Sequence, residues 1–215
     1  MYGFLKRLMD IAGSIIGLMI LSPIFLLIAL LIKITSSGPI FFTPVRVGQN
    51  GRPFRMYKFR SMRMYQINGR LAHAHEVLKS DPKLLEEYKK NSYKLINDPR
   101  ITFLGKFLRK SSLDELPQIL NILKGDMSLV GPRAYLPDEL VEQQKVYPET
   151  KPLVKSILKV RPGLTGFWQV SGRSNINFDK RIQMDYVYAN RKSIIYDLFI
   201  ILKTFPALFS GKGAV

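Results

Sequence analysis

Cysteine is absent from this 215-residue sequence, which excludes disulfide bonds and agrees with a cytoplasmic location. Internal repeats and low-complexity tracts are absent as well, so repeat architectures are excluded. Neither a P-loop nor a Rossmann glycine pattern is present, which argues against an ATPase or a dehydrogenase. The length is enough for one domain with its own core plus an accessory segment.

Acidic residues are scarce, with 16 Asp and Glu against 33 Lys and Arg, and the formal net charge is +17. Such an excess predicts an anionic partner, which could be nucleic acid, acidic lipid or a phosphorylated substrate. No helix-turn-helix, zinc-finger or aromatic RNA-binding motif is visible in the sequence. We therefore expect no nucleic-acid partner, and lipid and phosphorylated substrates remain.

One long apolar run covers residues 11–34 and carries a single charge, Lys33. As a straight helix it would reach about 36 Å, which is enough to span a bilayer core. Ser22 and Pro23 lie at its middle, where a proline can break the helix into two arms of about 17 Å each. The run is too long for a signal peptide, and no small-residue cleavage site follows it.

Basic residues flank this run on both sides. Lys6 and Arg7 precede it, and Lys33 and Arg46 stand at or beyond its end. The positive-inside rule would keep both ends on the cytoplasmic side, which favours a hairpin that enters and leaves by one face. A spanning helix stays open as an alternative, because proline is tolerated in membrane helices.

Two adjacent carboxylates, Asp114 and Glu115, open the most informative stretch of the sequence. Ser112 and Glu115 have the spacing of a capping box, and Gly125 is a plausible stop for the helix that follows. Apolar residues recur at helical spacing behind them, at Leu113, Leu116, Ile119, Leu120 and Leu123. A plain helix cap is the structural alternative, since acidic residues favour the first turn of a helix.

Cations surround this carboxylate pair in the sequence. Arg109 and Lys110 lie just before it, and Arg133 follows a Gly-Pro turn after it. Carboxylates ringed by cations suit a site that handles phosphates together with a divalent metal.

A glycine-rich motif covers residues 159–173. Its glycines would let the backbone approach a ligand, and the exposed N–H groups of such turns bind anions. These glycines are Gly163, Gly166 and Gly172. Arg161 and Arg173 bracket the motif, and Trp168 either stacks a base or belongs to the core.

Short strands are expected over residues 40–42 and 54–62, around a turn at Gln49–Gly51. By alternation, Lys58 and Arg60 share one face of the second strand and could point at a phosphate. Solvated side chains on a strand edge are the alternative.

Residues 63–98 read as a solvated insert, with a lid over the site as the alternative. Asp81 and Pro82 open a predicted helix within it. His73 and His75 form a His-x-His pair, but no other metal ligands cluster near them in the sequence, so we expect no metal there.

The C-terminal part predicts a helix over residues 178–189 and an apolar segment over 194–209. Asp197, Lys203 and Pro206 interrupt the apolar segment, which is too short and too charged to span a membrane. It either lies in the membrane interface or closes the core.

Taken together, these residues resemble the bacterial sugar transferases, the monotopic polyprenyl-phosphate phosphoglycosyl transferases that begin lipid-linked glycan assembly. The resemblance covers nearly the whole chain except about residues 63–96. The matching stretches are Lys6-Arg7 with Asp10, the apolar run broken at Ser22-Pro23, and residues 57–62, 97–100, 109–118, 125–133, 161–172 and 197–204.

The resemblance implies a mainly helical α+β fold. Residues 1–36 would form a re-entrant membrane helix hairpin, accompanied by amphipathic interfacial helices, and residues 37–215 a small cytoplasmic catalytic domain. The chain would act at the bacterial inner membrane, on its cytoplasmic face and in contact with its lipids. It looks like a stand-alone catalytic unit without the extra N-terminal membrane domain of larger members, and a homodimer is compatible with the sequence but not required by it.

The resemblance also implies a catalytic dyad of Asp114 and Glu115, with Mg²⁺ held at Asp114. The donor would be a UDP-sugar and the acceptor undecaprenyl phosphate, with Asp114 forming a covalent phosphosugar intermediate and UMP leaving. We expect three arginines to neutralise substrate phosphates, with three further cations as second-rank candidates. The first set is Arg109, Arg133 and Arg161, and the second is Lys58, Arg60 and Arg173.

Within the family, the insert, the stretch Gly-Phe-Trp-Gln-Val-Ser-Gly-Arg and the Gly-Lys-Gly-Ala ending are most similar to hexose-1-phosphate transferases that use UDP-galactose or UDP-glucose. Transfer from an N-acetylated UDP-sugar is one alternative. A non-enzymatic, basic membrane adaptor is the other.

Overall fold

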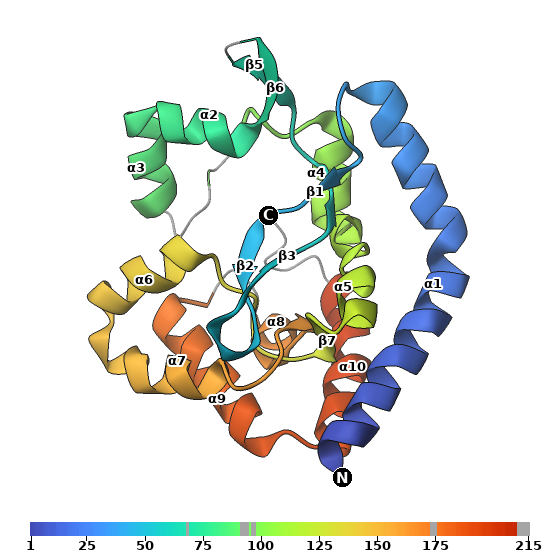
Figure 1. Cartoon of the computed structure of the whole chain (residues 1–215), viewed down its shortest axis with the longest axis vertical. Helices are drawn as coiled ribbons and strands as arrows, with labels where there is room; N and C mark the ends of the chain where they lie inside the picture. The colour runs from blue at the N-terminus through green and yellow to red at the C-terminus, as the bar shows by residue number, and fades with distance from the viewer. Residues whose placement is uncertain (68, 91–94, 96–97, 173–175, 210–215) are drawn as a thin grey trace.

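The structure is a computed structural model that describes residues 1–67, 69–90, 95, 98–172 and 176–209. It is mainly helical with short strands, which confirms the predicted α+β class (Figure 1). The helices are α1 (Tyr2–Thr35), α2 (Ala74–Ser80), α3 (Pro82–Lys90), α4 (Phe103–Ser111), α5 (Gln118–Lys124), α6 (Pro137–Val146), α7 (Lys151–Ile157), α8 (Phe167–Ser171), α9 (Phe178–Arg191) and α10 (Ile194–Phe209). The strands are β1 (Phe41–Phe42), β2 (Val45–Val47), β3 (Pro53–Arg55), β4 (Lys58–Phe59), β5 (Met64–Ile67), β6 (Arg70–His73), β7 (Ser128–Val130) and β8 (Gly163–Thr165). Short 3-10 turns are η1 (Gln49–Gly51), η2 (Leu113–Glu115) and η3 (Pro148–Thr150).

The strands pair two by two. β1–β4, β2–β3 and β5–β6 are antiparallel, and β7–β8 is parallel. The predicted turn at Gln49–Gly51 is confirmed as η1, with Asn50 in the left-handed region (φ 57°). The single strand predicted over residues 54–62 was wrong in extent: the chain leaves β3 after Arg55 and starts β4 at Lys58. The reason is that β3 pairs with β2 whereas β4 pairs with β1, so the two pieces serve different ladders.

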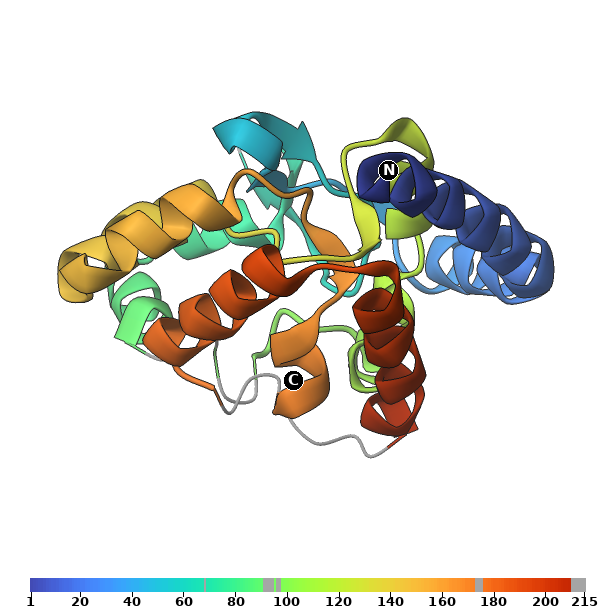
Figure 2. The ribbon, with the colours of Figure 1, turned by 90° about the horizontal axis from the view of Figure 1, so that it is seen from below.

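Helix α1 runs without interruption through Pro23, but it bends near its middle (Figures 1 and 2). Proline cannot donate to the carbonyl four residues earlier, which here belongs to Met19. The Ser22 hydroxyl donates to this carbonyl instead, at 3.1 Å. The predicted break is therefore a bend, and α1 is the one described helix long and apolar enough to cross a membrane by length and composition.

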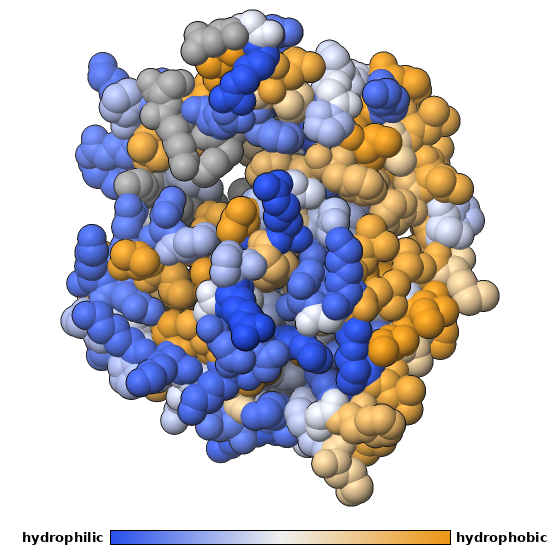
Figure 3. All heavy atoms as spheres, in the orientation of Figure 1, coloured by the Kyte–Doolittle hydropathy of each residue, from blue (hydrophilic) through white to orange (hydrophobic). Residues whose placement is uncertain are grey.

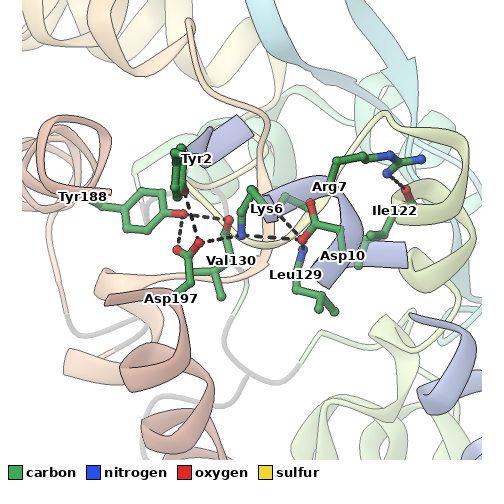
Figure 4. A network of polar contacts seen from close by, with 10 residues as sticks. Tyr2, Lys6, Arg7, Asp10, Ile122, Leu129, Val130, Tyr188 and Asp197 are labelled. Atoms are coloured by element: carbon green, nitrogen blue, oxygen red, sulfur yellow. Dashed lines mark hydrogen bonds and ion pairs between the residues drawn. The ribbon is translucent and has the colours of Figure 1, made fainter. Parts of the chain in front are cut away.

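The N-terminal arm of α1, before Pro23, is fixed to the body of the molecule by buried polar contacts (Figure 4). The Asp10 carboxylate accepts from the Ser128 hydroxyl at 2.9 Å and from the Leu129 amide at 3.0 Å. The Lys6 ammonium lies 3.1 Å from Asp197 and 3.5 Å from Asp10. These contacts tie α1 to β7 and α10 at once.

Two tyrosines and one arginine extend this attachment. The hydroxyls of Tyr2 and Tyr188 donate to the Asp197 carboxylate at 3.1 and 2.7 Å (Figure 4). Arg7 donates to two carbonyls at the C-terminal end of α5, at 2.6 and 2.8 Å. A guanidinium is favourable there, because the last carbonyls of a helix carry partial negative charge.

The C-terminal arm of α1, after Pro23, is attached by packing and by a second set of polar contacts. Ile28 and Ile32 are buried in a cluster with Phe59 and Leu108. The chain leaving the helix accepts hydrogen bonds from Arg60, which binds the carbonyls of residues 36 and 37. Both arms of α1 are therefore held by one and the same body.

The outer surface of α1 remains apolar and exposed. Hydrophobic side chains cover the edge of the molecule that α1 forms in Figure 3. The exposed residues around the bend are Ile15, Ile16, Met19, Ile20 and Ile24.

The insert forms the β5–β6 hairpin followed by α2 and α3, at one end of the molecule (Figure 1). The helix predicted from Asp81 and Pro82 is confirmed as α3. The Asp81 carboxylate accepts from the amides of Lys83 and Leu84, both at 3.1 Å, and so caps the helix. The lid role of this segment stays a prediction.

The C-terminal segment is one helix, α10, which continues through Asp197, Lys203 and Pro206. Asp197 does not interrupt it, because its carboxylate is buried and fully engaged in the network around Lys6. Ile200 packs in the core with residues of β7 and α9. The opposite face is apolar and exposed, at Ile195, Leu198, Phe199, Leu202 and Phe205. One face therefore closes the core, and the other stays available to an interface.

Gly131, Gly163 and Gly166 approach one another where β7 and β8 pair. A Cβ atom on Gly163 would overlap the backbone nitrogen of Gly131, and one on Gly166 would overlap the Gly131 carbonyl oxygen. The side of Gly163 and Gly166 on which a Cβ atom would lie is therefore taken by Gly131, while Gly163 also lines the cavity described below, so the approach of backbone to ligand stays a prediction.

We predict that Gly163→Ala destabilises the protein by about 3 kcal/mol, because the added methyl group would force β7 and β8 apart. Chemical denaturation of the parent and the variant in detergent would measure this loss. Gly3→Ala is the control, since a Cβ atom there meets nothing within 4 Å. Equal midpoints for Gly163→Ala and the parent would contradict the prediction.

Candidate active site

The carboxylate pair lies in a sharp turn between α4 and α5. Ser112 ends α4 in the left-handed region (φ 58°), and η2 then carries Asp114 and Glu115. The predicted capping box was wrong: the Ser112 side chain makes no capping hydrogen bond, and the Glu115 carboxylate accepts from Lys58 instead. The turn thus directs both acidic side chains to a residue distant in sequence.

Helix α5 begins only after Pro117, at Gln118, so the acidic residues precede the helix instead of forming its first turn. The predicted stop at Gly125 is confirmed, with φ at 91° and its amide bonded to the carbonyls of α5. Leu113 and Leu116 pack against the cluster that holds α1 and α4 together. This packing fixes the turn between two anchored helices.

Lys58, at the start of β4, faces both carboxylates. Its ammonium lies 2.7 Å from Glu115 Oε1 and 3.8 Å from Asp114 Oδ2. Asp114 is 7 % exposed, whereas a third of the Glu115 side chain is exposed. Glu115 therefore faces solvent-accessible space, and Asp114 lies deeper beside it.

The two carboxyl groups differ in acidity because their surroundings differ. Burial raises the pKa of Asp114 to about 6; Lys58 opposes this shift, and the charge of Glu115 adds to it. Burial alone would raise the pKa of Glu115 too, but the Lys58 ammonium, followed by Arg133 and Arg46, holds it below its ordinary value. Near neutral pH both groups are mainly carboxylates, and Asp114 is the more basic of the two.

A cavity opens beside Glu115. Its lining residues are Arg46, Met56, Lys58, Glu115, Gln118, Arg133, Ala134, Gly163, Leu164, Trp168 and Gln169. Three of its side chains are cationic, which suits a phosphorylated ligand. The structure thus brings Lys58, Glu115 and Arg133 together, although they are far apart in sequence.

Arg46 is the cationic residue of the cavity lining that the sequence did not identify as a site residue, because it is counted there only as a flanking charge. Its guanidinium donates to the Ala134 carbonyl at 3.3 Å. Burial, and then the neighbouring Arg133, lower the pKa of Arg46 to about 10. Alternation along a three-residue strand carries too little signal to predict this position.

Arg133 is held at its backbone by a buried acid. The Arg133 amide and the Tyr135 hydroxyl donate to one oxygen of Asp185, at 3.0 and 2.9 Å. Burial raises the pKa of Asp185 to about 7, although both hydrogen bonds oppose the shift. Asp185 therefore fixes the chain that carries the Arg133 guanidinium into the cavity.

Trp168 is buried, 6 % exposed, and also lines the cavity, so the core position is confirmed and the stacking of a base stays a prediction. The guanidinium groups of Arg133 and Arg181 lie 5.2 and 5.0 Å from the centre of its ring. Arg181 also pairs with the buried Glu139 at 3.4 Å. The indole is thus already contacted by two cations.

The remaining predicted cations are placed differently from one another. Arg109 lies in the last turn of α4, close enough to lower the pKa of Asp114. Arg161 precedes β8 and is not among the cavity-lining residues of the described chain. Arg60 is buried and bound to the end of α1, so the structure does not bring it to the carboxylate pair. Arg173 lies outside the described residues.

The site offers few protein ligands for a metal. Among the described residues, no group of three or more His, Asp or Glu side chains gathers in one place. Asp114 and Glu115 alone present adjacent carboxylates, and Lys58 already contacts one Glu115 oxygen. This donor set fits Mg²⁺, which commonly binds one or two carboxylates and completes its shell with water and substrate phosphates.

The arrangement suits chemistry at phosphorus. A buried carboxylate can act as a nucleophile, and positioned cations neutralise the charge of phosphate oxygens. The cavity beside it supplies such cations from three separate segments of the chain, at Arg46, Lys58 and Arg133.

Comparisons with known proteins agree with this reading. Residues 1–211 match the family model described as bacterial sugar transferase. The exopolysaccharide production protein ExoY of Sinorhizobium fredii is 42% identical over 99% of this chain and 88% of its own length. The undecaprenyl-phosphate galactose phosphotransferase of Salmonella typhimurium is 44% identical over 98% of this chain, and the UDP-glucose:undecaprenyl-phosphate glucose-1-phosphate transferase of Klebsiella pneumoniae is 39% identical over 97%. The chain spans 42% and 41% of these two longer relatives.

Proposed function

The chain belongs to the bacterial sugar transferase family, and we propose that it transfers a sugar-1-phosphate from a UDP-sugar to undecaprenyl phosphate. It is a transferase, and its relatives support sugar-1-phosphate transfer to a polyprenyl phosphate in exopolysaccharide or capsule synthesis. The products of the proposed reaction are undecaprenyl-diphosphate-sugar and UMP.

The observation that carries this proposal is the buried Asp114 beside Glu115, with Lys58 across from both and a cationic cavity adjoining them. A diphosphate donor and a phosphate acceptor both bring negative charge to such a site. Cations fixed by the fold can stabilise that charge without having to reorganise during the reaction.

In the proposed first step, an Asp114 carboxylate oxygen attacks the β-phosphorus of the UDP-sugar. The bond from this phosphorus to the bridging oxygen breaks, UMP leaves with the electron pair, and the phosphosugar stays on Asp114. In the second step, an oxygen of the acceptor phosphate attacks the same phosphorus, and the Asp114 carboxylate is released. Glu115, next to it and partly exposed, assists the acceptor phosphate in this step.

Asp114 is the residue we propose to hold Mg²⁺, which when bound would neutralise charge on the phosphate oxygens. Arg133 and Lys58 line the cavity and would bind the same oxygens directly. Arg109 lies close to Asp114 and lowers the pKa of its carboxyl group, which favours the ionised form. Arg161 and Arg173 stay predictions as phosphate ligands.

The proposed sugar is galactose or glucose. The Salmonella relative is named for galactose and the Klebsiella relative for glucose, which supports a hexose-1-phosphate donor. An N-acetylated UDP-sugar is the alternative, and the same assay separates the two.

We also propose that α1 enters the inner membrane and returns to the cytoplasmic face, where the catalytic body binds the lipid surface. Both arms of α1 are held by the same polar body, through Lys6 and Asp10 at one end and Arg60 at the other. A spanning helix would place one end about 30 Å away, beyond the hydrocarbon core. The exposed apolar surface runs along α1 and includes the bend, where a re-entrant helix would meet lipid.

A labelling experiment tests this topology. Because the sequence has no cysteine, single cysteines can be introduced as Gly3→Cys and Arg52→Cys. We expect an impermeant thiol reagent to label both from the same side of sealed vesicles. Met19→Cys, near the bend, should stay unlabelled from either side. Labelling of Gly3→Cys and Arg52→Cys from opposite sides would make α1 a spanning helix.

The proposed reaction is tested by a UMP-release assay with purified protein, Mg²⁺, undecaprenyl phosphate and a panel of UDP-sugars. We expect release with UDP-galactose or UDP-glucose, and loss of release when a chelator removes Mg²⁺. Release with N-acetylated sugars alone would keep the reaction and change the sugar. Release of UDP instead of UMP would indicate a glycosyltransferase. If no donor is consumed in a metal-dependent reaction, the non-enzymatic membrane adaptor becomes the favoured alternative.

A further inference from the structure

Two arginines of the cavity, Arg46 and Arg133, form no ion pair with a carboxylate within the part of the chain that the structure describes. They come from β2 and from the turn after β7, and both line the cavity beside Glu115. Each has a buried Nε atom without a hydrogen-bond partner among the described residues. Part of their hydrogen-bond donor capacity is therefore left unused by the described chain.

Placing two partly buried cations in one cavity costs free energy. Burial, followed by Arg133, lowers the pKa of Arg46, whereas nearby acidic groups, Glu139 first, raise the pKa of Arg133. In contrast, Arg181, which also contacts the Trp168 ring, pairs with Glu139 at 3.4 Å. An unpaired pair of cations in a cavity is the expected state of a site whose anion arrives with the ligand.

Trp168 supplies a second, independent observation. It is 6 % exposed and lines the same cavity, and its indole N–H is buried without an acceptor in the described chain. The indole N–H is a donor only, and a buried donor without an acceptor costs free energy. A ligand oxygen in the cavity would remove this cost.

We propose that Arg46, Arg133 and Trp168 form a subsite for a phosphate monoester, adjoining the carboxylate pair but separate from it. The leaving nucleotide and the incoming lipid phosphate occupy this subsite in turn. This inference rests on the proposed function only for the identity of these two ligands.

The chemistry of the two steps explains why one subsite serves both. In the first step the bond from Asp114 to phosphorus forms, and the bond from phosphorus to the UMP oxygen breaks. In the second step the acceptor oxygen bonds to phosphorus, and the bond to Asp114 breaks. Both displacements are in line, so the departing and the entering oxygen each lie opposite Asp114 and belong to a phosphate monoester.

The single tryptophan of the chain makes the subsite measurable without any turnover. Intrinsic fluorescence of the full chain in detergent would report on Trp168 alone during titration with UMP, inorganic phosphate, uridine or farnesyl phosphate. We expect the three phosphates to change the emission and uridine to leave it unchanged. We also expect farnesyl phosphate to displace UMP. Simultaneous, non-competing binding of these two would overturn the shared subsite.

Arg46→Gln is the decisive variant. We expect its affinity for UMP and for inorganic phosphate to fall about 10- to 100-fold, because a charge-assisted, two-point contact is lost. The affinity of Arg46→Lys for these ligands should fall less, since lysine keeps the positive charge but cannot make the two-point contact of a guanidinium. Arg55→Gln is the matched control, because Arg55 is exposed on the neighbouring strand β3 and lies outside the cavity lining of the described chain. Parent-like affinity in Arg46→Gln would overturn the proposal.

Thermal unfolding separates this role from a structural one. The melting temperature of Arg46→Gln should equal or exceed that of the parent, because the repulsion from Arg133 disappears. A variant that loses stability but keeps its affinity for UMP would make Arg46 structural and refute the subsite. If Arg46→Gln loses both stability and affinity for UMP, the Arg46→Lys variant decides. Weaker phosphate binding by a stably folded Arg46→Lys still supports the subsite. Parent-like phosphate binding by Arg46→Lys refutes the two-point contact of the Arg46 guanidinium.

The subsite and the proposed function can fail independently. If the parent releases UMP from a UDP-sugar while Arg46→Gln binds UMP as the parent does, the subsite alone is wrong. If the parent releases no UMP from any donor but binds inorganic phosphate through Arg46, the subsite stands and the proposed reaction is wrong.

Discussion

Asp114→Asn is expected to abolish UMP release and the covalent phosphosugar adduct together, lowering the rate by at least about 10³-fold. The asparagine amide has nearly the same shape as the carboxylate but no charge with which to attack phosphorus. The rate with UDP-sugar alone and the mass of the trapped protein would measure the two losses separately.

The neighbouring acid provides the matched control. Glu115→Gln should still release one equivalent of UMP per protein and accumulate the adduct, because we assign Glu115 to the second step. The two variants also differ in electrostatics, since Asp114 is buried and Glu115 is one-third exposed. UMP release at the parent rate by Asp114→Asn would exclude Asp114 as the nucleophile.

Lys58→Met is expected to lower UMP release at pH 7 by about 10²-fold. Burial raises the pKa of Asp114 to about 6, and Lys58 is the strongest influence that lowers it. Without the ammonium the pKa of Asp114 rises further, so less of this group is ionised at pH 7. Because the attacking form is the carboxylate, the acidic limb of the pH–rate profile should move to higher pH.

This shift distinguishes an electrostatic role of Lys58 from simple damage to the site. Raising the pH should restore part of the activity of Lys58→Met, since Asp114 ionises again, whereas a misfolded site would stay inactive at every pH. Lys110→Met, which removes an exposed cation near the same turn, should keep the parent profile. An unchanged acidic limb in Lys58→Met would refute the coupling between Lys58 and Asp114.

Features that depend on neighbours in the sequence could be predicted from the sequence. The α3 start at Asp81 and Pro82 and the α5 stop at Gly125 follow from local hydrogen bonding and from backbone conformation. The adjacency of Asp114 and Glu115, the length of the apolar run and the family resemblance need no long-range contact either. Each of these is a property of a few consecutive residues.

Other local patterns predicted the wrong partner. Ser112 and Glu115 have the spacing of a capping box, yet Lys58, 57 residues earlier than Glu115, takes the Glu115 carboxylate. A surface cap contributes about 1 kcal/mol, and a close contact with an ammonium in a partly buried site outweighs it. The spacing correctly indicated a turn, but it did not identify the cation that contacts the Glu115 carboxylate.

Lys58 and Arg60 also show that a local pattern does not identify the partner of a side chain. Alternation placed them on one strand face as equivalent phosphate ligands, but Lys58 contacts the carboxylate pair and Arg60 is buried against residues 36 and 37. The strand is only two residues long, and β1 and the end of α1 decide where each side chain goes. Periodicity has little predictive value on an element this short.

By itself, the sequence determined the adjacency of Asp114 and Glu115, the excess of basic charge, a helix of membrane length and the ends of several helices, because each follows from composition or from residues adjacent in the chain. The tertiary structure alone decided that Arg46, Lys58, Arg133 and Trp168 line one cavity beside Glu115. It also decided that Asp197 completes the attachment of Lys6 across 191 residues. The physical reason is that buried charges and donors are satisfied by whatever partners packing brings near, and packing joins segments whose separation along the chain carries no signal.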